Sequence, residues 1–330
     1  TGRRGLPLIG TGDWNDGFSN IGPKGQGESV WLAQFAALVA QRFAGICLSR
    51  EDSTKAKELL DLSQAMKTAV EEHAWNGKWY LRAFYDDGAP LGDKDASMCE
   101  IDVLPQAFAV LSGMADRQRA DSALREALSR LVDVGNGLVR LFAPSFDVAA
   151  LGENANNPGY ISAYPPGVRE NGGQYTHAAV WLCLALLRCG RAREGYALLR
   201  MISPAHRSAE PSLAAKYKTE PYSMAADVYA CSDVAGRGGW TLYTGAAGWY
   251  WRTVVQEMLG IRQRGGHVEL SPKLPPQWEG FEAALELGRT RIHVRVVRGE
   301  THRLTVDGEP AHVIPLDRRD HEAELTVERN

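Results

Sequence analysis

Apolar residues recur every three or four positions over several long stretches of this chain, the spacing of one face of an α-helix. Some stretches are apolar almost all round, and each of them precedes a short turn and a more amphipathic stretch. Helices of the first kind belong inside a protein, whereas amphipathic helices lie on an outer layer. Inner helices are therefore predicted over residues 28–48, 100–111, 174–189 and 244–259. Outer helices are predicted from Ser53, as the N-cap, and over residues 116–132 and 192–202.

Long polar loops precede the inner helices, so the chain alternates between loop, inner helix, turn and outer helix. This alternation predicts a toroid of helical hairpins, a mainly α fold. Seven helices are counted, and a closed barrel of six hairpins needs twelve. The others are expected from preceding residues or from a second copy of the chain. Because a candidate catalytic motif lies in the first 20 residues of a chain that does not begin with Met, we expect a C-terminal part of a longer protein.

The pattern changes after Gly260, where short runs alternate apolar and polar residues as half-buried strands do. Turn signals such as Gly265-Gly266 and Asp307-Gly308 separate these runs. A small antiparallel β-sandwich is predicted here. The expected domains are a helical domain at residues 1–262 and a C-terminal β domain at residues 263–330.

Composition narrows the class of protein. With 44% hydrophobic and 23% charged residues and a net charge of -3, the chain is typical of a globular protein, and it has no basic run that would bind nucleic acid. The apolar window at residues 30–48 is interrupted by Gln34, Gln41 and Arg42, so no transmembrane helix is expected there. The five cysteines are scattered and odd in number, which favours reduced, buried thiols in a cytoplasmic protein.

The loop before the first helix carries the strongest candidate chemistry. Its residues Asp13, Trp14, Asn15 and Asp16 place two carboxylates around an aromatic ring and an amide. An aromatic face stacks on the apolar face of a pyranose, and neighbouring Asp and Asn side chains bind its hydroxyls, which favours a sugar site. The alternative is an Asx turn that leads the chain into the helix.

Two other segments are candidates for binding an anion. The glycine-rich stretch 236–245 ends in Thr244 and Gly245 at a predicted helix start, where backbone N–H groups are free. The alternative is a tight turn with Thr244 as the helix cap. His177 lies one turn into an apolar helix, where it either donates to phosphate or is a satisfied core histidine. No spacing typical of zinc ligands and no nucleophile elbow occurs, so no metal is expected.

Six ordered motifs together resemble the inverting glycoside phosphorylases of the cellobiose and chitobiose phosphorylase family, glycoside hydrolase family 94. Within it they are most similar to the C-terminal phosphorylase-like domain of cyclic β-1,2-glucan synthases. The resemblance implies a partial (α/α)6 barrel followed by a small β domain. The motifs are GDWND (12–16), GQGESVW (25–31), DDGAPLG (86–92), PGVRENGGQYTH (166–177), EPY (220–222) and GGWTLYTG (238–245).

The resemblance also implies roles for single residues. Asp16 matches the general acid and Trp14 matches the tryptophan of the donor sugar subsite. Phosphate is expected to bind His177, Thr244 and Gly245, together with an arginine upstream of this chain. The other residues expected to bind substrate are Asp13, Asn15, Glu170, Gln174 and Tyr175, of which Glu170 and Gln174 match acceptor-side residues only loosely.

The implied activity is reversible, inverting phosphorolysis of β-linked gluco-oligosaccharides, with β-1,2 the favoured linkage and α-glucose 1-phosphate the product. One carboxylic acid suffices, because phosphate is itself the nucleophile and no other cofactor is needed. The alternatives are an inverting hydrolase, with Glu170 or Asp227 as the second carboxylate, and a non-catalytic glucan-binding segment. The isolated chain is expected to be inactive, and anchoring of the whole protein in the inner membrane stays open.

Overall fold

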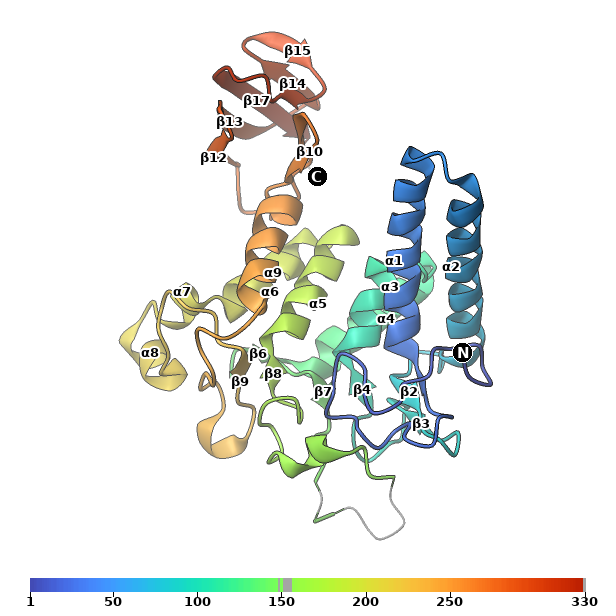
Figure 1. Cartoon of the computed structure of the whole chain (residues 1–330). Coiled ribbons are helices and arrows are strands. Elements are labelled where there is room, and N and C mark those ends of the chain that lie inside the picture. The colour runs from blue at the N-terminus through green and yellow to red at the C-terminus, as the bar shows by residue number, and fades with distance from the viewer. Residues whose placement is uncertain (148, 151–155, 329–330) are drawn as a thin grey trace. The chain divides into compact units, whose positions relative to one another are not determined.

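The computed structural model describes residues 1–147, 149–150 and 156–328. The chain forms two compact units (Figure 1). One consists of Thr1–Ala185 and Arg200–Trp249, and the other of Leu186–Leu199 and Tyr250–Asn330. The domain boundary at residue 262 stays a prediction, because this division follows contacts rather than the change in sequence pattern.

Helices form where the apolar periodicity predicts them, in the expected order. In Figure 1, α1 and α2 lie side by side as an antiparallel hairpin, and α3 and α4 follow. The mainly α fold of this part of the chain is confirmed. The helix bounds are α1 Val30–Ser49, α2 Ser53–His73, α3 Val103–Leu111, α4 Arg117–Leu131, α5 Thr176–Arg188, α6 Ala192–Ile202 and α9 Ala246–Arg252, which continues as the π-helical turn Thr253–Met258.

Side-chain caps fix where these helices begin. Ser29 caps α1 by accepting a hydrogen bond of 3.0 Å from the backbone N–H of Leu32. Asp102 caps α3 through Leu104, at 2.7 Å. The prediction that Ser53 caps α2 is wrong: the cap is Asp52, whose carboxylate accepts from the N–H of Lys55 and leaves Ser53 as the first helical residue. A carboxylate is also favoured at a helix N-terminus by the helix dipole.

Two short helices in the loop after α6 escaped the sequence analysis. They are α7 Pro204–Arg207 and α8 Pro211–Tyr217, and each begins with a proline. Proline is favoured in the first turn because its missing N–H needs no partner there. The described residues therefore contain nine α-helices rather than the seven counted.

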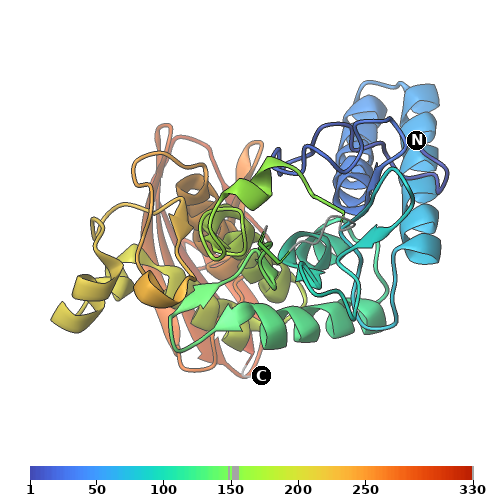
Figure 2. The same ribbon diagram turned by 90° about the horizontal axis from the view of Figure 1, so that it is seen from below.

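Two-residue strands lead into the inner helices and align the loops in front of them. β1 (Glu28–Ser29) precedes α1 and pairs with β2 (Ala83–Phe84), which also pairs with β3 (Pro90–Leu91). β4 (Ile101–Asp102) precedes α3 and β8 (Gln174–Tyr175) precedes α5. Figure 2 looks onto the end where these loops lie. The remaining pairs are β4 with β7 (Phe142–Ala143), β5 (Val132–Asp133) with β6 (Leu138–Val139), and β8 with β9 (Asp227–Val228).

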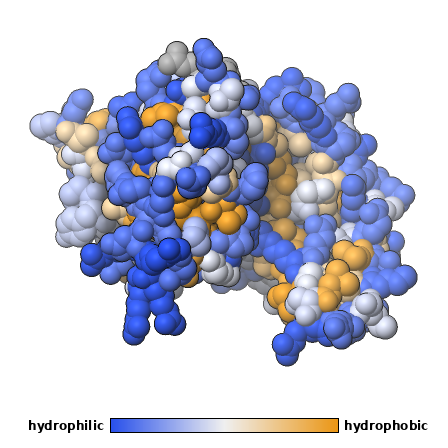
Figure 3. Space-filling model, turned by 90° about the horizontal axis from the view of Figure 1, so that it is seen from above, coloured by the Kyte–Doolittle hydropathy of each residue, from blue (hydrophilic) through white to orange (hydrophobic). Residues whose placement is uncertain are grey.

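Helix α1 is covered on one side only. Phe35, Val39, Phe43 and Ile46, spaced three or four residues apart, are 39%, 47%, 50% and 55% exposed. The apolar group at the lower right of Figure 3 lies on this hairpin. The expectation that α1 is buried on all sides therefore holds for only part of its surface.

By length and composition α1 could cross a membrane, and within the described chain it is the helix that meets this test. Its mean hydropathy is 1.4, and 44% of the tested window is buried inside the protein. The buried amide of Gln34 donates to the carbonyl of Pro105 at 3.0 Å, which fixes α1 against the start of α3. A core helix passes the same test, so this finding is weak support for a membrane span.

The second unit contains the β-rich part of the chain, as the alternating pattern predicts. Along β13 every second side chain is buried, and Ile292, Val294 and Val296 form its core face. One pair, β13 with β17, is parallel, a direction that alternation does not reveal. The two sheets are β10-β11-β16 and β12-β13-β17-β14-β15, with strands Ile261–Arg264, His267–Leu270, Gly280–Leu287, Thr290–Gly299, Arg303–Val306, Glu309–Ala311, Ile314–Pro315 and His321–Glu328 for β10 to β17.

All five cysteines are free thiols, as predicted, and the expected burial is correct for three of them. Cys47, Cys99 and Cys183 are buried thiols, whereas Cys189 is exposed and Cys231 is half-buried.

Candidate active site

Two Asx turns fold the loop before α1 and turn its four candidate residues in different directions. The Asp13 carboxylate accepts from the backbone N–H of Asn15 at 3.0 Å, and the side-chain Oδ1 of Asn15 accepts from the backbone N–H of Gly17 at 3.1 Å. Gly12, at a φ of 140°, makes the tight approach possible, because a Cβ there would lie 2.9 Å from the Cα of Asp16. The Asx-turn interpretation is therefore correct for Asp13 and Asn15, and it leaves Asp16 exposed and available.

Asp13 is held inside the protein. Its side chain is fully buried and accepts two hydrogen bonds from Arg82, at 2.6 and 2.7 Å, and one of 2.6 Å from the Ser29 hydroxyl. Burial opposes ionisation, but the charge and hydrogen bonds of Arg82 outweigh it and lower the pKa of Asp13. The sequence analysis expected Asp13 to bind sugar, and in this arrangement the carboxylate instead holds the loop in place.

Trp14 points toward the start of α5. Its ring meets Tyr175 at 5.1 Å edge to face, His177 at 5.8 Å and Trp181 at 5.6 Å. The structure thus joins the first candidate loop to the candidate residues before and within α5. Such an assembly of aromatic faces with polar edges is suited to a sugar ring.

His177 lies among tryptophans, with its ring 4.2 Å from Trp181 and 5.9 Å from Trp249. Burial lowers the pKa of His177 to about 4, so its imidazole is neutral at physiological pH. Its Nε2 is buried and has no hydrogen-bond partner among the described residues. His177 is therefore not the satisfied core histidine that the sequence allowed, and this nitrogen is free for a ligand.

Thr244 and Gly245 reach the same neighbourhood through α9. The Thr244 hydroxyl accepts from the N–H of Ala246 at 3.0 Å and so forms a turn just before α9, one residue ahead of the N-cap position. The carbonyl of Gly245 accepts from Trp249 at 3.2 Å, one turn later. Because the ring of Trp249 contacts His177, α9 contributes a side chain to the same aromatic cluster.

Both acceptor-side candidates, Gln174 and Glu170, already have polar partners in the structure. The buried amide of Gln174 accepts from the N–H of Val139 at 3.0 Å and donates to the Thr176 hydroxyl at 3.2 Å, which leaves it a structural part in this arrangement. Glu170 lies 3.4 Å from the guanidinium of Arg169 and is 13% exposed.

Asp227, named as a second carboxylate for a hydrolase, lies opposite Tyr175 in the β8–β9 pair. Its Oδ1 accepts from the N–H of Trp240 at 3.1 Å, and its buried Oδ2 has no partner in the described part of the chain. Gly239 is required beside it, since a Cβ would lie 2.3 Å from Oδ1. Burial raises the pKa of Asp227.

Four residues at this site were missed by the sequence analysis. Trp181 and Trp249 follow His177 and Gly245 by four residues, so helical spacing would have found them. Tyr160 lies beside Asp16: burial, a hydrogen bond to Asp16 and its charge raise the pKa of the phenol to about 12. No sequence signal pointed to Tyr160 or to Arg82, because only the fold brings them to the loop.

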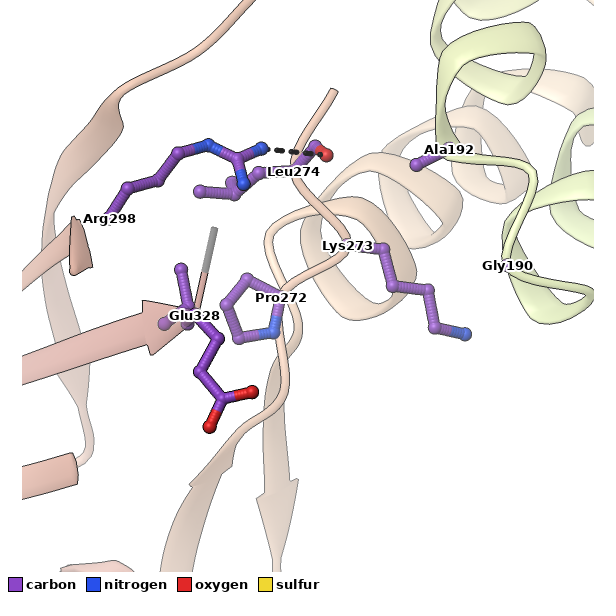
Figure 4. A pocket seen from close by; sticks show the side chains of 8 residues that line it. Gly190, Ala192, Pro272, Lys273, Leu274, Arg298 and Glu328 are labelled. Atoms are coloured by element: carbon purple, nitrogen blue, oxygen red, sulfur yellow. Dashed lines mark hydrogen bonds between the residues drawn. The ribbon is translucent and has the colours of Figure 1, made fainter. Parts of the chain in front are cut away.

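A separate cavity of about 160 Å³ lies within the second unit (Figure 4). Two of its charged groups already have partners: Arg298 donates to backbone carbonyls, including that of Leu274, and Lys273 pairs with Glu257. We therefore assign the candidate site to the aromatic cluster around Trp14 and His177. In the described residues no cluster of His, Cys, Asp or Glu is arranged to hold a metal ion.

The described residues thus form a mainly helical part with an aromatic cluster around Trp14 and His177, followed by a β-rich part. The family model of the glycosyl hydrolase 94 superfamily, catalytic domain, matches residues 1–260. The model of the glycosyl hydrolase family 65, C-terminal domain, matches residues 261–325. The chain belongs to the glycosyl hydrolase 94 superfamily, and the resemblance seen in its motifs is confirmed.

Curated relatives are phosphorylases and a glucan synthase. The chain is 42% identical over 315 residues to cyclic beta-(1,2)-glucan synthase NdvB of Rhizobium meliloti (strain 1021), covering 94% of this chain and 11% of that protein. It is 32% identical over 309 residues to solabiose phosphorylase of Paenibacillus borealis, covering 92% and 37%. The chain thus spans only a minor part of either relative.

Among solved structures, one described as a sialidase matches with a TM-score of 0.58 at 13% identity, over 95% of this chain and 27% of that one. A GH78 family rhamnosidase of Bacillus sp. GL1 matches with a TM-score of 0.52 at 11% identity, over 91% and 27%. At these identities the likeness concerns the fold alone.

Proposed function

We propose that this chain supplies the acid and part of the phosphate site of an inverting phosphorylase that acts on β-linked gluco-oligosaccharides. The observation that carries the proposal is the contact between Trp14 and His177. The indole ring, suited to stacking on a sugar, lies beside a buried imidazole whose Nε2 has no hydrogen-bond partner among the described residues. Membership of a superfamily that includes the phosphorylase relatives above supports the reaction class.

In the proposed reaction, phosphate attacks the anomeric carbon while the bond from that carbon to the leaving oxygen breaks. Asp16 donates its proton to the leaving oxygen, and Trp14 holds the donor sugar. Inversion at the β-linked carbon gives an α-sugar 1-phosphate. Asp16 is exposed beside Tyr160, so its carboxyl is accessible from solvent.

His177, Thr244 and Gly245 are proposed to bind the phosphate. A neutral imidazole with its proton on Nε2 donates one hydrogen bond to a phosphate oxygen, and an anion bound there raises the pKa of the ring and strengthens the contact. The roles of Thr244 and Gly245 rest on the family resemblance, since the Thr244 hydroxyl already accepts a hydrogen bond from the N–H of Ala246. Inorganic phosphate acts as a co-substrate, and no other cofactor is proposed.

A β-1,2 linkage is proposed for the substrate. Two relatives whose names specify this linkage support the proposal. They are the cyclic β-1,2-glucan synthase and a 1,2-beta-oligoglucan phosphorylase of Listeria innocua that is 26% identical over 155 residues, 43% of this chain and 14% of that protein. The activity belongs to the whole protein that contains this chain.

The test is to incubate that whole protein with phosphate and β-1,2-, β-1,3- or β-1,4-glucobiose and to measure α-glucose 1-phosphate. We expect product from the β-1,2 disaccharide, and loss of about 100-fold or more in Asp16→Asn. Asp61→Asn, an exposed carboxylate on α2, is the matched control and should leave the rate unchanged.

Two outcomes would favour the alternatives. Glucose released without phosphate would point to a hydrolase, with Asp227 or Glu170 activating water. Oligoglucan binding with no turnover would point to a glucan-binding segment. Full turnover in Asp16→Asn would reject Asp16 as the acid.

A further inference from the structure

Arg82 is a fully buried guanidinium at the centre of a charged cluster beneath the Asp16 loop. Its Nη1 and Nη2 donate to the two oxygens of Asp13 at 2.7 and 2.6 Å. Its Nε lies 3.2 Å from a carboxylate oxygen of Asp102, and all three side chains have no exposed surface. On its other side the guanidinium lies 5.0 Å from the ring of Phe18.

The members of this cluster come from four separate places in the chain. Asp13 lies three residues before Asp16, and Arg82 directly precedes β2. Ser29 caps α1 and also donates to Asp13 at 2.6 Å, while Asp102 caps α3. The cluster therefore ties the Asp16 loop to the first turns of two inner helices.

The hairpin of β2 and β3, which follows Arg82, also holds the rest of the loop before α1. The carboxylate of Asp86, just after β2, accepts from the backbone N–H groups of Lys24, Gln26 and Gly27 at 2.8, 2.8 and 2.9 Å. Arg82 and Asp86 thus fix the two halves of the segment between Gly12 and α1. Nothing else in the described chain contacts the Asp13 carboxylate with a positive charge.

A buried ion pair with this geometry gives little net stability, because removing charges from water costs about as much as their attraction returns. The pair does fix the orientation of the Asp13 carboxylate. A guanidinium forms a rigid contact with both carboxylate oxygens, which a lysine ammonium cannot reproduce. Burial raises the pKa of Asp102 to about 6, against the charge of Arg82, so Asp102 is the weaker of the two carboxylate partners.

We propose that Arg82, anchored by Asp102, is a positioning residue that acts through Asp13 to set the place of Asp16 for proton transfer. This inference rests on the proposed role of Asp16 as the acid. Arg82 has no exposed side-chain surface with which to touch a substrate; it fixes the turn that carries Asp16. Tight control is required there, since a shift of about 1 Å in a catalytic group costs about 100-fold in rate.

The experiment compares Arg82→Lys, Asp102→Asn and wild type in the whole protein, with β-1,2-glucobiose and phosphate as substrates. For Arg82→Lys we expect kcat to fall about 100-fold while KM for phosphate stays within about two-fold, because the phosphate residues lie on other loops. Asp102→Asn keeps the Asp13–Arg82 pair and should lose about 10-fold in kcat. Arg119→Lys, which breaks the contact with Glu71 between α2 and α4, is the control and should leave both constants unchanged.

The double variant Arg82→Lys, Asp16→Asn gives a readout that a purely structural role would not. If Arg82 acts through Asp16, the double variant loses no more rate than Asp16→Asn alone. Additive losses, a kcat unchanged in Arg82→Lys, or a KM for phosphate that rises in step with the fall in kcat would overturn the proposal. Should Arg82→Lys not fold, Asp102→Asn is judged by the same criteria, alone and with Asp16→Asn.

The two proposals fail in different ways. If wild type makes no sugar phosphate but releases glucose, phosphorolysis is rejected, and the same comparison is made on hydrolysis, which also needs the acid. If wild type cleaves nothing, both proposals fall. If wild type makes α-glucose 1-phosphate and the Arg82 variants behave as wild type, only the positioning role is rejected.

Discussion

The rings of Trp14 and His177 lie 5.8 Å apart at an interplanar angle of 70°, and this contact joins the loop before α1 to the first turn of α5. Two segments far apart in the sequence thereby meet in one aromatic cluster. This cluster combines aromatic faces with a buried ring nitrogen that has no hydrogen-bond partner among the described residues. That combination is what a site for a sugar and an anion requires.

Replacing Trp14 should weaken use of the sugar. Trp14→Ala removes the aromatic face and its contacts with Tyr175 and Trp181, so kcat/KM for the oligosaccharide should fall about 10-fold or more. Trp14→Phe keeps a smaller ring and should lose less. Trp251→Ala, at a side chain 60% exposed, serves as the control. Equal rates in Trp14→Ala and wild type would remove Trp14 from the donor site.

His177 should make stability fall at acid pH. Burial lowers its pKa from 6.5 to about 4, so between these values the unfolded chain binds more protons than the folded one. The free energy of unfolding should therefore fall as the pH drops from 6.5 toward 4, by about 1 to 3 kcal/mol from this residue. Denaturant unfolding of wild type and His177→Asn at pH 7 and pH 4.5 measures it. A pH dependence that is the same in both proteins would contradict this assignment.

In the second unit, His321 should act in the opposite direction. Its Nδ1 lies 2.8 Å from Asp307 and its Nε2 lies 2.9 Å from Asp317. Burial opposes the charge, but these carboxylates outweigh it and raise the pKa of His321 above 6.5. The stabilisation is fully present below pH 6.5 and is lost as the pH rises through the folded pKa.

His321→Gln should accordingly lower the melting temperature more at pH 6 than at pH 9. The control is His293→Gln, an exposed histidine whose ring nitrogen lies 2.9 Å from Glu322. A similar loss at both pH values for His321→Gln would show that the two carboxylates do not hold a charged ring.

The uncovered face of α1 should make the isolated chain self-associate. Phe43 and Ile46 are 50% and 55% exposed, and apolar side chains gathered on a surface favour contact with another surface. Phe43→Asp with Ile46→Asp should reduce association, measured by light scattering, with little loss of melting temperature. Ala37→Asp, at a buried position of the same helix, should instead unfold the chain. Unchanged association in the double variant would contradict the prediction.

Helices were predictable where local spacing and packing agree. α4 and α6 have a clear polar face and an apolar face, and their predicted bounds agree closely with the observed ones. The cap of α2 was misplaced by one residue because Asp52 and Ser53 are both good caps, and only the backbone geometry distinguishes them. The parallel pairing of β13 with β17 depends on a long-range contact, which alternation along one strand does not encode.

At the site, the sequence indicated which residue types are present but not the role of each residue. Asp13 and Asp16 are equivalent by type and lie three residues apart, yet one is buried against Arg82 and the other is exposed. Gln174 has the polarity of a ligand, yet its amide is used by Val139 and Thr176. Tyr160 and Arg82 carry no local signal, because they meet the Asp16 loop only after the chain has folded.

The sequence by itself determined the helical order, the β-rich C-terminal region and the family, because hydrophobic period and ordered motifs are properties of the chain alone. Tertiary structure decided which carboxylate is a buried anchor and which is free, and which histidine nitrogen lacks a partner. The physical reason is that burial, charge and hydrogen bonding at one residue are set by neighbours from distant segments. Arg82 holds Asp13 inside the protein, and Asp16 is left as the exposed carboxyl of the loop.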